Sequence, residues 1–96
     1  MIICSQNRWE THIISGHPEL ENRENDVADS VKEPDCIYKS EAYNDRDVYF
    51  KYIPNEKEYI KTIVSVNNNF GEVVTSFPKR TISGGIGDEI YVKPEL

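Results

Sequence analysis

Both histidines of the chain, His12 and His17, lie near its start in the run Trp-Glu-Thr-His-Ile-Ile-Ser-Gly-His-Pro-Glu. The ordinary pKa of a histidine side chain, about 6.5, lets it give and take protons near neutral pH. Either residue could therefore serve as a general acid or a general base. They stand on either side of Gly16, a residue type that often ends a helix. This run is the first candidate for a catalytic site.

The charge of the chain is unevenly distributed. It carries 11 basic and 17 acidic side chains, and the net charge of -6 argues against a general nucleic-acid-binding protein. Residues 1–50 hold the whole excess of negative charge, whereas residues 51–96 are neutral. The basic side chains of the second half are Lys51, Lys57, Lys61, Lys79, Arg80 and Lys93. A cleft among them could attract an anion.

Cys4 and Cys36 are the two cysteines, and no Cys/His spacing typical of a zinc site occurs. We therefore expect two free thiols and no bound metal, as in a reducing cytosol. The apolar start, residues 1–4, is too short for a secretion signal or a membrane span. The sequence predicts a soluble, cytoplasmic protein with no membrane partner.

A short helix is expected to hold the first histidine. Asn7 and Glu10 resemble a capping box, which predicts a helix over residues 8–15. Trp9 and Ile13 are spaced i, i+4 and would form the buried stripe of this helix. The first histidine would then lie beside that stripe, at the edge of the core.

A second helix is expected over residues 18–33. Pro18 suits the first turn of a helix, and Pro34 would end it. Its apolar face would consist of Leu20, Val27, Ala28 and Val31. The remaining positions are charged and solvated, so this helix would carry much of the negative charge of the chain.

The sequence changes after residue 34 to β-branched and aromatic residues separated by polar turn clusters. We expect strands over residues 36–39, 48–53, 59–66 and 73–77, with a weaker strand over 90–92. The links between them are short, which favours hairpins and an antiparallel sheet. The predicted fold is α+β: a single domain over residues 1–96, in which two N-terminal helices pack on a four-stranded antiparallel sheet.

Several short motifs follow one another along the chain. They are Trp-x-x-His-Ile at 9–13, His-Pro-Glu at 17–19, Pro-Asp-x-Ile at 34–37, a strand with Lys51, an apolar strand at 60–66 and Val-Val-Thr-Ser-Phe at 73–77. In this order they resemble the phage-associated nuclease domains of the barnase, EndoU, colicin and RelE-like superfamily, the BECR fold. The resemblance implies a metal-independent, toxin-like ribonuclease with N-terminal helices on a four-stranded antiparallel sheet. The implied partners are an RNA substrate and either a cognate inhibitor or further copies of the chain.

Cleavage of RNA without a metal proceeds by attack of a 2′-OH on the neighbouring phosphate. It needs a base, an acid for the leaving 5′ oxygen and donors for the phosphorane oxygens. His12 could be the base or the acid, and His17 could take the other role or simply end the loop. Lys51 or Lys61 could neutralise the developing charge, while Thr75 could donate a hydrogen bond to a phosphate oxygen. Further substrate contacts are expected from Arg80 and Ser76, and no cofactor is expected.

Each of these residues also has a plain structural explanation. A histidine beside an apolar stripe, such as His12, is often a structural residue at the edge of the core whose ring nitrogens have hydrogen-bond partners. Lys51 and Lys61 could be solvent-facing strand residues that protect the sheet from edge pairing. Thr75 forms strands well because it is β-branched. The alternative function is therefore a non-catalytic, acidic interaction module or an oligomerising domain that uses the negative face of the second helix.

Overall fold

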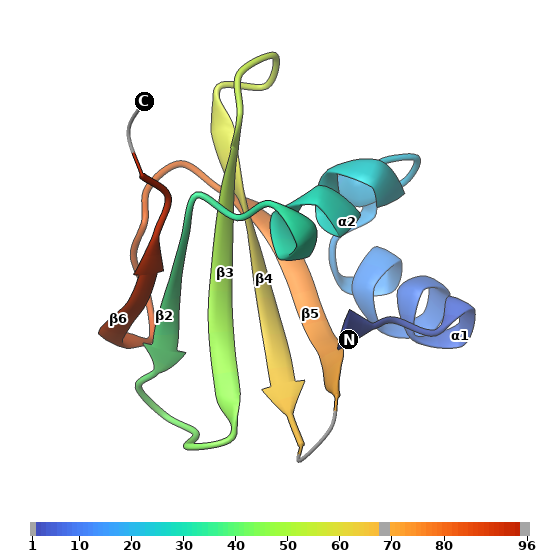
Figure 1. Cartoon of the computed structure of the whole chain (residues 1–96). Helices are drawn as coiled ribbons and strands as arrows, with labels where there is room; N and C mark the ends of the chain where they lie inside the picture. Colours follow the sequence, from blue (N-terminus) through green and yellow to red (C-terminus); the bar gives the residue numbers. More distant parts are fainter. Residues whose placement is uncertain (1, 68–69, 95–96) are drawn as a thin grey trace.

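The computed structural model describes residues 2–67 and 70–94, with all side chains in these ranges except those of Asn7, Thr11 and His12. Its elements are β1 (Ile2–Ile3), α1 (Gln6–Arg8), the π-helix η1 (Trp9–Ile14), the 3-10 helix η2 (Pro18–Leu20), α2 (Glu24–Lys32), β2 (Cys36–Ser40), β3 (Arg46–Ile53), β4 (Glu58–Val66), β5 (Gly71–Lys79) and β6 (Ile86–Val92). Figure 1 shows one twisted sheet, with the helical segments gathered at one side of it.

The strands are ordered β1-β5-β4-β3-β2-β6 across the sheet. From β2 to β5 they form an antiparallel meander, in which each strand pairs with the next along the chain. β6 pairs antiparallel with β2, whereas β1 pairs in parallel with β5 through Ile2 and Ile3. The predicted fold class is therefore wrong: the described sheet is mixed and six-stranded, because segments from both ends of the chain extend the four-stranded meander.

The helical layer also differs from the prediction of two N-terminal helices. Of the described helices, only α2 is an α-helix longer than one turn. The first helical segment begins after Ser5, whose hydroxyl accepts a hydrogen bond from Arg8 N (3.1 Å), and most of it is π-helix. The expected helix over 18–33 is interrupted because Asn22 has a φ of 66°. This left-handed conformation does not occur within a continuous right-handed helix.

The strand positions follow the sequence pattern closely. The expected segments 36–39, 48–53, 59–66 and 73–77 lie within β2, β3, β4 and β5. The weak strand expected over 90–92 is the end of β6, which begins at Ile86. Alternation of apolar and polar residues thus located the strands correctly, although it did not give the order in which they pair.

The side of the sheet that carries α2 is here called the helix face. Thr62 of β4 points to it, since its hydroxyl oxygen lies 2.7 Å from that of Ser30 in α2. The buried core on this face contains Trp9, Ile13, Leu20, Val27, Ile60 and Val73. Side chains alternate between the two faces along a strand, so Lys61 and Ile63 point to the other face.

The other side, here called the crossover face, is covered by residues 80–85, which connect β5 to β6. Because β4, β3 and β2 lie between those two strands, this crossover segment has to pass over the sheet. Figure 1 shows it running behind the strands, on the side away from α2. A second, smaller core forms beneath it, made of buried Cys36, Val48 and Phe50 and joined by Tyr38, Tyr59, Ile63, Ile82 and Ile86. Within the described ranges, no helix has both the length and the apolar character needed to cross a membrane.

Candidate functional site

His17 precedes η2, and its ring stacks on the ring of Phe77 in β5. The two ring centres are 5.0 Å apart and the planes differ by 27°. Nδ1 of His17 lies 3.5 Å from Oε1 of Glu19, and 35% of the histidine side chain is exposed. A ring that is held by stacking, has a carboxylate beside one nitrogen and remains in contact with solvent is suited to proton transfer.

Lys61 of β4 is 5% exposed and points into the crossover face. Its Nζ donates hydrogen bonds to the carbonyl oxygens of Ser83 (3.0 Å) and Gly84 (2.6 Å), and lies 5.4 Å from the centre of the Phe77 ring. Burial lowers the pKa of this ammonium group, and the nearby charge of Lys79 lowers it further. The interpretation of Lys61 as a solvent-facing residue is therefore wrong, because the crossover segment closes over it.

Phe77 lies between two of the residues expected to be catalytic, since it contacts His17 and Lys61. Across the β4–β5 pair, Phe77 stands opposite Lys61 and Thr75 stands opposite Ile63. Directly opposite residues of an antiparallel pair point to the same face, so Thr75 also lies on the crossover face. The structure thus places His17 and Lys61 in contact with Phe77, and Thr75 two positions before Phe77 on the same face of β5.

Lys51, the other lysine expected near the phosphate, points to the opposite side of the sheet. It stands opposite Ile60 across the β3–β4 pair, and Ile60 belongs to the core beneath the helices. Lys51 therefore shares the helix face, whereas Lys61 shares the face of Phe77. Arg80 begins the crossover segment and is exposed.

Ser76, expected to contact the substrate, is fully buried on the helix face. Its hydroxyl oxygen lies 2.9 Å from that of Thr62, which lies 2.7 Å from that of Ser30. The three hydroxyls connect β5, β4 and α2, so Ser76 holds the layers together rather than facing the group formed by His17 and Lys61.

His12, the other expected acid or base, lies in η1. Its side chain is outside the part of the structure that is described, so its catalytic role stays a prediction.

Two features of this face had not been assigned a role from the sequence. Phe77 supplies the ring that links His17 to Lys61, and Lys79 follows it at the next position on the same face. The signal that could have indicated them is the alternation Thr75, Phe77, Lys79, in which every second residue of one strand has the chemistry of a phosphate or base contact. The backbone carbonyl groups of residues 83 and 84, which accept hydrogen bonds from Lys61, could not be predicted from the types of side chain in the sequence.

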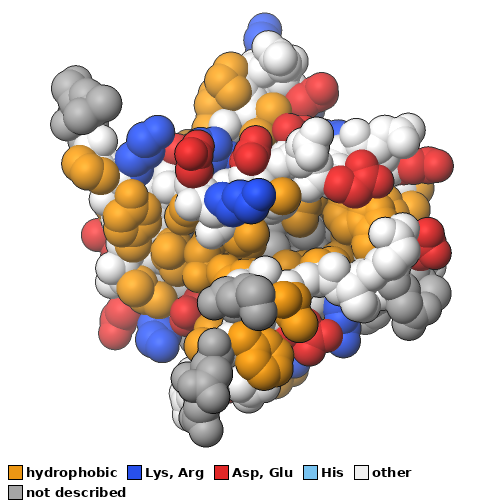
Figure 2. Space-filling model, turned by 45° about the vertical axis from the view of Figure 1, so that its right-hand side comes forward, with side chains coloured by type: hydrophobic (Ala, Val, Ile, Leu, Met, Phe, Trp, Pro, Cys, Tyr) orange, Lys and Arg blue, Asp and Glu red, His pale blue; other side chains and the backbone are white. Residues whose placement is uncertain are grey.

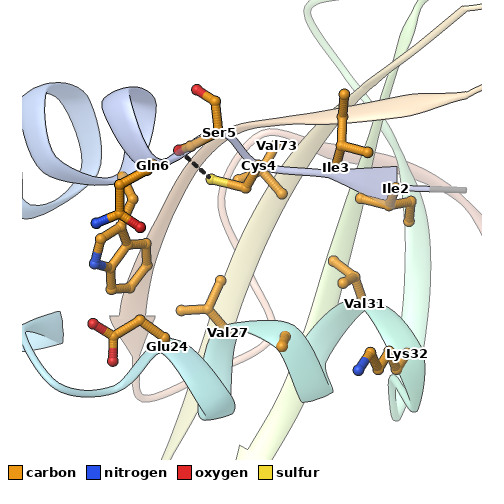
Figure 3. A pocket seen from close by; sticks show the side chains of 12 residues that line it. Ile2, Ile3, Cys4, Ser5, Gln6, Glu24, Val27, Val31, Lys32 and Val73 are labelled. Carbon is orange, nitrogen blue, oxygen red and sulfur yellow. Dashed lines mark hydrogen bonds between the residues drawn. The ribbon is translucent and has the colours of Figure 1, made fainter.

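A groove of about 690 Å³ lies elsewhere, between residues 2–6 and α2. Figure 3 shows its mainly apolar walls, and Figure 2 shows hydrophobic side chains exposed among charged ones on this side of the molecule. The thiol of Cys4 lies in the groove and contacts the carbonyl oxygen of Ser5 at 3.8 Å. Burial raises the pKa of that thiol, which keeps it protonated and weakly nucleophilic. The groove offers an apolar surface but little acid–base chemistry.

The described part of the chain brings together no group of three or more His, Cys, Asp and Glu side chains that could hold a metal ion. No protein-family model, curated protein or solved structure matches the chain. The arrangement on the crossover face is therefore the main guide to function.

Proposed function

We propose that the chain is a metal-independent endoribonuclease whose active site lies on the crossover face. One observation carries this proposal: His17, which can transfer protons, and Lys61, which carries a positive charge, both contact the ring of Phe77. Thr75 on the same strand adds a hydroxyl donor to this face. A base or acid, a cation and a donor are the three kinds of group that cleavage by a 2′-OH needs.

The reaction can be written with these groups. The 2′ oxygen attacks the adjacent phosphorus while a base takes the 2′ proton. The bond from phosphorus to the 5′ oxygen breaks, and an acid protonates that leaving oxygen. The products are a 2′,3′-cyclic phosphate and a free 5′-OH. His17 fills one of the two proton-transfer roles, His12 is the candidate for the other, and Lys61 stabilises the negative charge that builds up on the phosphorane.

A cleavage assay in excess chelator tests the proposal. Single-stranded RNA, tRNA and ribosomal RNA are incubated with the folded protein, and the products are analysed for 2′,3′-cyclic phosphate ends. His17→Ala should reduce the rate by about 10²-fold or more, the usual effect of losing a general acid or base. His12→Ala should reduce the cleavage rate by a factor of the same order. Lys51→Gln is the matched control, because Lys51 lies on the helix face.

Two results would contradict the proposal. One is the absence of cleavage across the RNA panel by protein shown to be folded, which would leave the interaction module as the better explanation. The other is equal cleavage of an all-deoxy substrate, because DNA lacks the attacking 2′-OH. If RNA is cleaved but His17→Ala leaves the rate unchanged, the residue assignment is wrong.

A further inference from the structure

Two ammonium groups converge at one point of the crossover segment. A β carbon placed on Gly84 would lie 3.1 Å from Nζ of Lys61 and 3.2 Å from Nζ of Lys79. Lys79 stands opposite Tyr59 across the β4–β5 pair, and both lysines point to the crossover face. Gly84 has a φ of 87°, a conformation that favours glycine, and the absence of a β carbon lets both ammonium groups approach its backbone closely.

The two charges lack a carboxylate partner in the described chain. The ion pairs there involve Arg8, His17, Arg23 and Lys39, and neither Lys61 nor Lys79 has an acidic oxygen within 4.0 Å. Two of the three donors of the Lys61 ammonium go to backbone carbonyls, which carry no net charge. Like charges held together near a buried site repel each other, and an anion between them would remove that repulsion.

Two ammonium groups near one point have the chemistry to bind a phosphate. Hydrogen bonds from an ammonium group to an anionic oxygen are about 2.7 to 2.9 Å long. An anionic oxygen that accepts hydrogen bonds from both ammonium groups would have to lie beside Gly84, since both nitrogens are close to the β-carbon position of that residue. Phe77 lies two residues before Lys79 on the same face, so such a phosphate would be close to the ring on which His17 stacks.

We propose that Lys61 and Lys79 together bind the phosphate of the RNA substrate at Gly84, with Lys79 as a second phosphate-binding residue. This inference rests on the proposed ribonuclease function. Two positive charges match the doubly negative phosphorane better than the singly negative diester. Lys79 should therefore contribute more to kcat than to KM.

Binding of inorganic phosphate, followed by backbone amide NMR, tests the site without relying on cleavage. At pH 7.5 and constant ionic strength, phosphate should shift the amide signals of Gly84 and Gly85 in a saturable way. Lys79→Gln should weaken this binding about tenfold or more, which corresponds to the loss of one charge-assisted contact. Lys51→Gln, which removes a positive charge from the helix face, should change it less than about twofold. Lys79→Arg should restore most of the binding.

The outcomes separate this inference from the proposed function. Phosphate binding at Gly84 that depends on Lys79, in a protein that cleaves no RNA, would support the site and contradict the nuclease. RNA cleavage by a protein in which Lys79→Gln changes neither phosphate binding nor kcat would overturn the role of Lys79 and leave the nuclease standing. The site is also overturned if no saturable shift appears, or if Lys51→Gln weakens binding as much as Lys79→Gln. The amide spectrum of each variant reports whether it is folded.

Discussion

The chain of buried hydroxyls between helix and sheet leads to a quantitative prediction for Thr62→Val. Ser30 Oγ lies 2.6 Å from the carbonyl oxygen of Val27, so its single proton is donated there. Ser30 must then accept from Thr62, and Thr62 in turn must accept from Ser76. The order of donation is therefore Ser76 to Thr62 to Ser30 to Val27. All three hydroxyl residues are fully buried.

Because of this direction of donation, removing the hydroxyl of Thr62 should cost more stability than removing that of Ser76. Thr62→Val keeps the shape of the side chain but leaves the Ser76 proton without an acceptor, and a buried unsatisfied group costs roughly 1–3 kcal/mol. Adding the lost bond to Ser30, we expect the free energy of unfolding to fall by about 2–3 kcal/mol. Ser76→Ala removes only the first donor of the chain and should cost about 1 kcal/mol.

Urea and thermal unfolding followed by circular dichroism measure these differences. In a domain of this size, Thr62→Val should lower the Tm by roughly 10 °C or more. The double variant Thr62→Val/Ser76→Ala should be less destabilised than the sum of the two single variants, because it contains no orphaned donor. Thr81→Val is the control: its hydroxyl pairs with that of Ser83 in an exposed position, so the change should stay within about 0.5 kcal/mol. Equal losses for Thr62→Val and Ser76→Ala, or simple additivity, would refute the assigned direction.

Three further predictions concern titration, thiol reactivity and the core. Because burial and Lys79 lower the pKa of Lys61, its ammonium group should lose its proton in an NMR titration with a midpoint below the ordinary value of 10.5. Lys79→Gln should move that midpoint upward. A midpoint at or above 10.5 in the unchanged protein would contradict this prediction. Cys4 is exposed and Cys36 buried, so a thiol reagent should modify Cys4 slowly in the folded protein, because its pKa is raised, and Cys36 only on unfolding, as peptide mass spectrometry can show. Ile13→Ala should lower the free energy of unfolding in urea by about 2–5 kcal/mol, since Ile13 is fully buried; a loss below 1 kcal/mol would argue against the described core.

The strands were predictable from sequence because their signals are local. Alternating β-branched and aromatic residues mark each strand, and polar clusters mark the turns between them. The helical layer was less predictable: the sequence predicted a cap at Asn7, whereas the helix begins after Ser5, whose hydroxyl accepts from the backbone of Arg8. The left-handed Asn22 gave no sign that it would interrupt the second helix. β1 is only two residues long, and its pairing with β5 depends on tertiary contacts rather than on its own sequence.

The candidate site was predictable in its residue types but not in its geometry. Sequence alone left Lys51 and Lys61 as equal candidates, since both lie in strands next to apolar residues. The strand register separates them: Lys51 stands opposite Ile60, one position away from Lys61, and adjacent strand positions point to opposite faces. A register slip of one residue between β3 and β4 would put both lysines on the same face of the sheet, and hairpin register is set by turn geometry rather than by the lysines themselves.

The crossover segment also has a consequence for how the protein is made on the ribosome. Translation proceeds from the N-terminus, so all residues of the meander from β2 to β5 emerge from the ribosome before the crossover segment does. The crossover face is still bare at that point, because the residues that cover it and the two carbonyl groups that receive the Lys61 ammonium come later in the chain. The crossover segment can therefore cover this face only after the four strands of the meander have been synthesised. A nascent chain that has emerged only as far as residue 82 would contain β1 to β5 and the helices but would lack β6, a finished second core and both carbonyl partners of the Lys61 ammonium.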